Sequence, residues 1–198
     1  MKIRIKRKKV MKEAAISPEE YLEDGPEIKL EIGDWGLEIN AGDIGNLEAY
    51  PIACKLNGIT VYSIAWAGAK GGYGPLLYDI ALEALWKFQK AALTSDRTQV
   101  STHAKAVWDY YLENRGDVEK IQMDIDKETI AQTSVPLKHL TEPTDDDCPQ
   151  KISIRYASKI RGAKNAPNWY QQSTAYAYIK RDPTTILKLG DHLIIDAD

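Results

Sequence analysis

A glycine-rich loop between an apolar run and an amphipathic pattern constrains the fold of this chain more than any other feature. Residues 59–67 are rich in β-branched and aromatic side chains, and Asn57-Gly58 before them favours a two-residue hairpin turn. Residues 50–56 and 59–67 should therefore pair as antiparallel strands. The loop 68–74 contains four glycines, and Pro75 after it suits the first position of a helix, where no N–H is needed.

Two amphipathic helices are predicted after this loop. From Pro75, apolar residues recur at steps of three and four, which indicates a helix with one wide buried stripe. The opposite, polar side is formed largely by Tyr78, Asp79, Glu83 and Lys87. A short strand at about 91–95 should follow. Ser101 is a typical N-cap residue, and the apolar stripe after it predicts a second helix that ends near Asn114.

The loop can bind an anion at the start of the first helix. The N–H groups of a first helical turn have no partners within the helix, the helix dipole favours negative charge, and glycine lets a phosphate approach the backbone. Lys70 adds a positive charge to the loop. A tight turn without a ligand explains the same glycines equally well, so both alternatives stay open.

The order of strand, glycine loop, long helix, strand and helix resembles the acetyl-CoA-binding half of the GNAT (Gcn5-related N-acetyltransferase) superfamily. There, a Gln/Arg-x-x-Gly-x-Gly/Ala loop binds the coenzyme A pyrophosphate through backbone N–H groups. Gly72-Tyr73-Gly74 match its two small positions, while its basic position falls on Ala69, with Lys70 one residue away. The resemblance implies a mixed α/β fold in which an antiparallel meander precedes the strand–helix–strand–helix unit.

A narrower resemblance is to GNAT-like proteins that tailed bacteriophages encode. It covers about residues 61–148 and is specific in the blocks 72–79, 95–97 and 101–111, with Asp146-Asp147-Cys148 as a further match. It implies a protein of the infected cell's cytoplasm or of the virion. It also leaves two functions open: an acyl-CoA-dependent N-acetyltransferase, or a catalytically inactive GNAT-fold protein that serves as a virion component or binds host proteins.

The resemblance implies specific site residues for acetyl-CoA or another acyl-CoA. The cofactor would be bound by Lys70, Gly71, Gly72, Tyr73 and Gly74, with the thioester carbonyl at backbone N–H groups near Trp66 and Ala67. The acceptor would be an amine that the sequence does not identify. A carboxylate or a water chain would act as base in this chemistry.

The catalytic assignments follow the last helix and the strands before the loop. In the superfamily this helix carries an alanine and, four residues later, a tyrosine that can protonate the departing thiolate. Trp108 stands four residues after Ala104, so the assignment moves one turn further to Tyr111. Glu48 and Asp79 are candidates for the base by position alone, with a solvated surface acid as the alternative for each; Glu48 is the residue we assign.

Other polar residues point more weakly to function. Ser95-Asp96-Arg97 ends a predicted strand beside the expected cleft, where an Asp96–Arg97 pair fixing the loop is favoured over substrate contact. His103 lies in the first turn of a helix, where exposure is common. Cys54 and Cys148 lack metal-ligand spacing and are interpreted as free thiols. The aspartates at 145–147 indicate a solvated turn rather than a metal site.

Charge and composition limit the partners. The chain is 43% hydrophobic and 28% charged, as ordinary globular proteins are, and no apolar run approaches the roughly 20 residues of a membrane span. The basic residues 1–12 are interpreted as an edge strand over residues 2–6, with nucleic-acid binding as the less favoured alternative. The same alternative applies to the basic and aromatic residues at 151–178.

The remaining pattern predicts the order of the domain. Ser17-Pro18 begins a short helix, and residues 28–32 and 35–39 form a hairpin that extends the meander. Residues 121–125 form a short strand or a loop. Residues 1–150 should form the α/β domain, and 151–198 an extension that packs on it or on a partner. Its last element should be a helix over 186–195, capped by residues 182–185.

Overall fold

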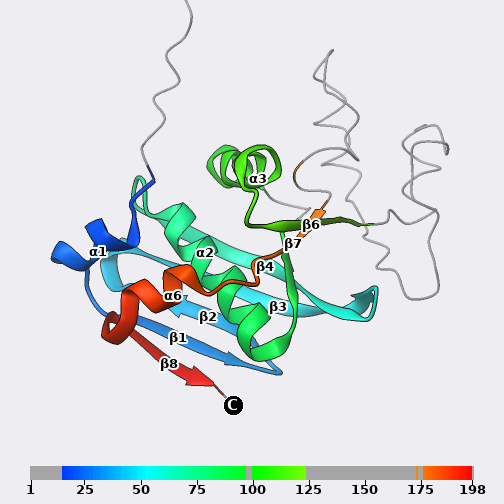
Figure 1. Ribbon diagram of the computed structural model, residues 1–198, viewed down its shortest axis with the longest axis horizontal. Helices are drawn as coiled ribbons and strands as arrows, with labels where there is room; N and C mark the ends of the chain where they lie inside the picture. The colour runs from blue at the N-terminus through cyan, green and yellow to red at the C-terminus, as the bar shows by residue number, and fades with distance from the viewer. Residues whose placement is uncertain (1–14, 97–99, 124–172, 174–175, 198) are drawn as a thin grey trace, which may run out of the picture.

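The computed structural model describes residues 15–96, 100–123, 173 and 176–197, with the backbone alone at residues 53 and 54 (Figure 1). These residues form a mixed α/β fold around one eight-stranded sheet with the strand order β6-β7-β5-β4-β3-β2-β1-β8. The strands are β1 Ile28–Gly33, β2 Gly36–Asn40, β3 Gly45–Leu56, β4 Ile59–Ala69, β5 Ala92–Thr94, β6 Glu119–Gln122, β7 Tyr176–Ile179 and β8 Leu193–Ala197. The helices are α1 Pro18–Asp24, α2 Gly74–Ala84, α3 Thr102–Asn114 and α6 Thr184–Leu189.

The predicted antiparallel meander is confirmed in strands β1 to β4. The hairpin between β3 and β4 pairs Leu56 with Ile59 across a two-residue turn. Asn57 and Gly58 both have positive φ, 51° and 79°, which the hairpin turn matching the strand twist requires.

The second half of the sheet follows α2. Strand β5 pairs in parallel with β4 over Val61 to Ser63, so α2 is the crossover between two parallel neighbours. Strand β7 lies between β5 and β6 and is antiparallel to both. Residues Glu119–Gln122 form strand β6, so the first two residues of the segment 121–125 are in a strand; Met123 is not, and residues 124 and 125 lie outside the described residues.

Both predicted helix starts with a serine cap are confirmed. Ser17 and Glu20 form a capping box at α1, in which Ser17 Oγ accepts from the Glu20 N–H and Glu20 accepts from the Ser17 N–H. Ser101 Oγ accepts from the Ala104 N–H at the start of α3. Helix α3 ends at Asn114, as the pattern predicts.

The prediction for the C-terminal helix was wrong in two respects. Helix α6 ends at Leu189, and the residues after it form a short 3₁₀ turn and then strand β8, which pairs in parallel with β1 at the edge of the sheet. Its first turn is not capped by Asp182, because the backbone N–H groups of Thr185 and Ile186 donate to the Glu83 carboxylate of α2, at 2.8 Å each.

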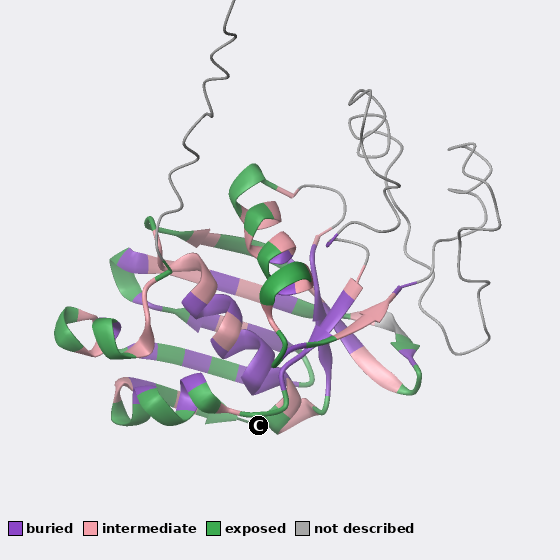
Figure 2. Ribbon diagram, turned by 45° about the horizontal axis from the view of Figure 1, so that its top comes forward, coloured by how far each residue is buried: buried purple, intermediate pink, exposed green. Residues whose placement is uncertain are grey.

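The polar side predicted for α2 was wrong for Tyr78 and Glu83, whereas Asp79 is partly exposed and Lys87, beyond the end of α2, is exposed. Tyr78 and Glu83 are buried, with exposed fractions of 4% and 1%, and Figure 2 shows α2 buried over most of its surface. The sheet, α3 and α6 surround this helix. Since a helix enclosed on all sides has no solvated face, its polar residues need partners within the protein.

The hydrophobic core occupies both faces of the sheet unequally. The main cluster joins α1, α2, α3 and α6 to alternate residues of β1 to β5, such as Ile28 and Leu30. A smaller cluster that includes Val61 and Ala92 lies on the opposite face, because Val61 alternates with the main-cluster residue Tyr62 along β4. The described part of residues 151–198 contributes strands β7 and β8 to this same sheet and helix α6 to the main cluster.

Several predictions fall outside the described residues. These are the strand at 2–6, Arg97 and its pairing with Asp96, the aspartates at 145–147, Cys148, the boundary at 150, and residues 151–172. The side chain of Cys54 is outside them as well.

Candidate functional site

A cavity of about 230 Å³ lies where the parallel strands β4 and β5 separate. Its walls come from three parts of the chain: the end of β4, the segment from Ser95 to α3, and α2. The lining residues are Ile64, Ala65, Trp66, Ala67, Tyr78, Ser95, Asp96, Val100, Ser101, Ala104 and Trp108. Crevices beyond the carboxyl ends of neighbouring parallel strands are a common place for ligands in α/β proteins.

The unequal lengths of the two strands open this cavity. Strand β5 ends at Thr94, opposite Ser63, whereas β4 continues to Ala69. Ala65 is an extra residue of β4, because Glu48 pairs with Trp66 and the next residue of β3 pairs with Ile64. Such a bulge bends a strand. Within the described chain, no strand pairs with this edge of β4 beyond Ser63, so alternate backbone groups there are available to a ligand.

Trp108 forms the buried wall of the cavity on α3. Its ring stacks on Tyr178 of β7 at a centroid distance of 5.0 Å and meets Tyr78 of α2 edge-on, also at 5.0 Å. Trp108 is 1% exposed. This aromatic packing holds α3 against α2 and the sheet at the buried side of the cavity.

The structure separates the predicted cofactor residues into two groups. Trp66 and Ala67 line the cavity, and the Trp66 side chain is 59% exposed, with its indole N–H donating to Asn46 Oδ1 at 3.1 Å. The loop residues from Lys70 to Gly74 do not line it, and they connect β4 to the start of α2.

The glycine loop forms a tight turn. The Tyr73 N–H donates to the Lys70 carbonyl at 3.2 Å, and Gly72, the third residue of this turn, has φ 83°. A positive φ at this position is typical of a type II turn and favours glycine. Among the described residues, the N–H groups of Gly71, Gly72 and Gly74 donate no hydrogen bond. The loop thus presents backbone donors beside the positive end of α2.

Neighbouring segments hold this loop in place. The Ile16 N–H donates to the Gly72 carbonyl at 3.0 Å, and the Tyr73 ring packs edge-on against Tyr21 of α1. The Lys70 ammonium forms an exposed ion pair with Asp43 at 2.6 Å and lowers the pKa of that carboxyl. Lys70 therefore has an internal partner, and an incoming anion would compete with Asp43 for its charge.

Tyr111, the residue predicted as general acid, does not line the cavity. Its buried hydroxyl donates to Asp79 Oδ1 at 2.8 Å and lies 3.3 Å from the Pro75 carbonyl. Burial and the Asp79 carboxylate raise the pKa of this hydroxyl well above its usual range. In this arrangement Tyr111 ties α3 to the first turns of α2.

Glu48, the residue predicted as base, lies beside the cavity and not in its lining. It is partly exposed, pairs across strands with Trp66, and accepts from the Tyr50 hydroxyl at 3.2 Å. The register places Glu31, Glu38 and Glu48 in one row across β1, β2 and β3. This row leads to Trp66 along the sheet face opposite α2.

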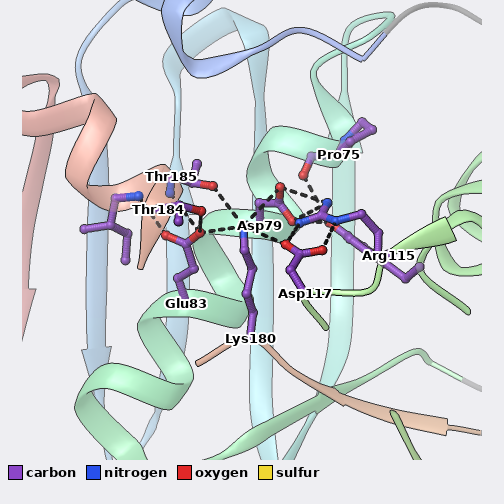
Figure 3. Close-up of polar contacts among 10 residues, drawn as sticks. Pro75, Asp79, Glu83, Arg115, Asp117, Lys180, Thr184 and Thr185 are labelled. Carbon is purple, nitrogen blue, oxygen red and sulfur yellow. Dashed lines mark hydrogen bonds and ion pairs between the residues drawn. The ribbon is translucent and has the colours of Figure 1, made fainter. Parts of the chain in front are cut away.

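Asp79 is neither a solvated surface acid nor a cavity residue. It belongs to a group of charged side chains, here called the ion network, that joins α2 to the segment after α3 and to the end of β7 (Figure 3). The members are Asp79, Glu83, Arg115, Asp117 and Lys180. The apolar periodicity of the sequence did not predict this network. The spacing of Asp79 and Glu83 could have indicated it, because two like charges four residues apart destabilise a helix unless a cation lies nearby.

The network pairs each charge at short distance. Lys180 Nζ lies 2.6 Å from Glu83 Oε1 and 3.5 Å from Asp79 Oδ2. Arg115 donates two hydrogen bonds to Asp117, at 2.7 Å each, and also contacts Asp79 at 3.0 Å. The hydrogen bonds from Arg115 lower the pKa of Asp117 to about 2. The network is thus a satisfied, largely structural assembly.

Tyr78 is the cavity residue that the sequence did not indicate. It lines the cavity from α2 and is 4% exposed, yet its hydroxyl makes no hydrogen bond to any described residue. Burial raises the pKa of Tyr78 to about 12. The sequence signal was ambiguous, because an aromatic residue on an apolar helix usually serves only in packing.

The other polar cavity residues are Ser95, Asp96 and Ser101. Asp96 is half-buried and provides a carboxylate at the wall. His103 is exposed at the start of α3, as expected. No group of three or more His, Cys, Asp or Glu suited to a metal ion occurs within the described residues. None of the described helices is long and apolar enough to span a membrane.

Comparisons of the chain with protein-family models, with curated proteins and with solved structures gave no match.

Proposed function

We propose that this protein binds acetyl-CoA or another acyl-CoA and transfers the acyl group to an amine. The observation that carries the proposal is the cavity between the diverging strands β4 and β5, with an edge of β4 that no described strand pairs with on one side and a glycine loop leading into α2. The meander followed by strand, loop, helix, strand and helix is the layout implied by the resemblance to GNAT proteins.

The loop and the cavity suit the two ends of an acyl-CoA. The pyrophosphate would bind the free N–H groups of Gly71, Gly72 and Gly74, where the dipole of α2 favours negative charge. The pantetheine arm, an amide chain, would run along the unpaired edge of β4 past Trp66. The thioester would then lie in the cavity, with backbone N–H groups of β4 near its carbonyl oxygen.

The open sheet face beside the cavity suits the approach of an amine. The row of Glu31, Glu38 and Glu48 gives this face negative charge, which raises the local concentration of a cationic acceptor. The exposed Trp66 ring ends the row at the cavity. A carboxylate of this row, or Asp96 in the wall, would accept the ammonium proton before attack.

The test is calorimetric titration of the purified protein with acetyl-CoA and with free coenzyme A, using variants of Gly74. A Cβ atom at Gly74 would meet no neighbouring heavy atom within 4 Å, so Gly74→Glu fits without a clash at its Cβ and adds a negative charge beside the N–H groups proposed for the pyrophosphate. An acidic residue in the first turn does not weaken a helix, and Gly74→Ala is the uncharged control. Gly72 is a poorer choice, because its φ of 83° strains any side chain.

We expect micromolar affinity in the wild-type protein and in Gly74→Ala, and at least a tenfold loss in Gly74→Glu. Equal affinity in the two variants would reject the loop as the phosphate site. If the folded wild-type protein binds neither ligand, the proposed function is wrong.

A second candidate is a non-catalytic interaction protein built on the same fold, either a virion component or a protein that binds host proteins. It is favoured by one observation: neither Tyr111 nor Glu48 lines the cavity. The first candidate should release free coenzyme A from acetyl-CoA when an acceptor amine is present, and the second should not. Binding of acetyl-CoA without any release of free thiol, in the presence of amines of varied chemistry, would support the second candidate.

A further inference from the structure

Strand β8 borders the sheet with a sequence that edge strands usually avoid. Among the described residues it pairs with β1 alone, and Figure 1 shows it at the end of the sheet. An edge strand leaves a row of backbone N–H and C=O groups unpaired, and proteins usually protect such a row with lysine, proline, a bulge or a covering segment. The five residues Leu-Ile-Ile-Asp-Ala of β8 include neither lysine nor proline, and their register with β1 is unbroken. This edge is therefore suited to a further strand.

The sheet face beside this edge is acidic. Asp196 of β8 is opposite Glu31 of β1, so it extends the row of Glu31, Glu38 and Glu48 to the edge. Like charges directly opposite one another on neighbouring strands are destabilising. Lys29, two residues before Glu31 on β1, offsets only part of this charge. A strand added beside β8 is thus favoured if it brings cations to Asp196.

We propose that residues 2–6 of this chain, which lie outside the described residues, pair with the outer edge of β8 and place their cations on the acidic face. Their sequence, Lys-Ile-Arg-Ile-Lys, alternates cations with isoleucines, and the charged residues within 1–12 are all basic. The segment therefore complements the edge in charge.

The alternation of β8 matches that of the segment. Leu193 and Ile195 pack with the main cluster, whereas Ile194 and Asp196 are exposed on the opposite face. Side chains alternate between the two faces of a sheet, so a strand with cations beside Asp196 has its isoleucines beside Leu193 and Ile195. The opposite facing would place the cations against the apolar cluster, which is costly.

The chain is long enough to reach this edge. Near the start of α1, Glu19 Oε1 lies 2.8 Å from Lys188 Nζ of α6, the helix that precedes β8. From residue 6 to Ile16, where the Gly72 carbonyl accepts the backbone N–H, an extended chain spans roughly 30 Å. The five residues of β8 span about 17 Å. The segment can therefore lie along β8 without moving α1.

Charge also argues against the other pairings available to these edges. A second copy joined through β8 would bring the acidic rows of the two copies together, with Asp196 of each copy at the junction. The other end of the sheet, β6, has the charged residues Glu119 and Lys120 among its four residues, and charge is itself a protection of an edge.

The test is residue-resolved amide hydrogen exchange of the full chain by NMR, measured at the β8 amides that do not bond β1. Arg4→Pro/Ile5→Pro breaks the segment, because neighbouring residues of a strand direct their N–H groups to opposite sides and one proline must remove a donor towards β8. Lys8→Pro/Lys9→Pro is the matched control outside residues 2–6. Amides of β2, between β1 and β3, are the internal reference for the fold.

We expect the β8 amides to exchange about tenfold more slowly in wild type and in the control than in Arg4→Pro/Ile5→Pro, as the net strength of a hydrogen bond allows. Equal exchange in the two double variants, fast or slow, would refute the pairing.

A second pair of variants tests the facing of the cations. Arg4→Glu reverses a charge of the proposed strand, and Lys9→Glu makes the same change outside it. Exchange at β8 should be faster in Arg4→Glu, because its carboxylate would lie on the acidic face. Equal rates in these two variants would overturn the proposed facing.

The remaining outcomes identify what else covers the edge. Slow exchange that persists in Arg4→Pro/Ile5→Pro and strengthens with protein concentration would assign β8 to a second copy, which overturns the proposal. Fast exchange in wild type while the β2 amides stay protected would show that the edge is free, and the proposal would be wrong.

Discussion

The polar side chains on the two sides of helix α2 differ in whether they have partners within the protein. On one side, Asp79 and Glu83 meet Arg115 and Lys180 in the ion network, where every charge has a partner (Figure 3). On the other side, Tyr78 borders the cavity with no partner among the described residues. Buried charges need partners for the fold to persist, whereas an unsatisfied hydroxyl at a cavity is available to a ligand. The comparison thus distinguishes polar groups that stabilise the fold from a polar group that remains available at the cavity.

The largest expected effect comes from breaking the network at Glu83. This carboxylate pairs with Lys180 at 2.6 Å and accepts the N–H groups of Thr185 and Ile186 at the start of α6. Glu83→Ala leaves a buried ammonium without its nearest partner and α6 without a cap. We expect the free energy of unfolding to fall by about 3–5 kcal/mol, measured by urea denaturation.

Two controls test the cause of that loss. Glu83→Gln retains an oxygen acceptor for α6 without the charge, so it should fall between wild type and Glu83→Ala. Glu113→Ala removes an exposed glutamate of α3 and should change stability by no more than about 0.5 kcal/mol. A Glu83→Ala protein as stable as wild type would mean that the network contributes little and that the comparison is wrong.

The sequence predicted local structure better than the network or the cavity. Ser17, Ser101, Asn57-Gly58 and Pro75 each act through neighbours within a few residues, and the elements that they begin or connect were predicted. Glu83 and Lys180 lie far apart in the sequence, and no local pattern indicates their pairing. The burial of Tyr78 and Glu83 was missed for this reason.

The wrong prediction of a helix over residues 186–195 also arose because a local pattern does not record long-range pairing. Leu193 and Ile194 were assigned to the apolar side of a helix, but the apolar run 193–195 suits a strand that pairs with β1 equally well, because short apolar runs fit both structures. Gly190 was the available stop signal, and the structure has it directly after α6. The position of Trp66 at the cavity could be expected from the resemblance, but the bulge at Ala65 that helps to open it could not.

A smaller effect distinguishes the two tyrosine hydroxyls by stability. Tyr111→Phe removes a buried hydrogen bond to the Asp79 carboxylate, so the free energy of unfolding should fall by about 1–2 kcal/mol. Tyr78→Phe removes a hydroxyl without a partner and retains the contact with Trp108. It should leave stability within about 0.5 kcal/mol of wild type. Equal losses in the two variants, by thermal or urea denaturation, would show that the Tyr78 hydroxyl is bonded after all.

The smallest effect is the acid titration of the network at Asp117. Its pKa is lowered to about 2 by the hydrogen bonds from Arg115, so the folded protein holds the ionised form more strongly than the unfolded chain, where the pKa is about 3.9. The stabilisation is present above pH 4 and is lost as the pH falls towards 2. Because the Asp117 side chain is 45% exposed, solvent screening limits the loss to about 1 kcal/mol.

The measurement is the difference in unfolding free energy between pH 6 and pH 3 for wild type and Asp117→Asn. The asparagine does not titrate, so the variant should lose less stability over this interval. Asp191→Asn, at an exposed residue with no ion pair among the described residues, should keep the wild-type difference. An Asp117→Asn protein with the wild-type difference would place the acid sensitivity elsewhere in the chain, and the network side of α2 would then be held by Glu83 and Lys180 without help from Asp117.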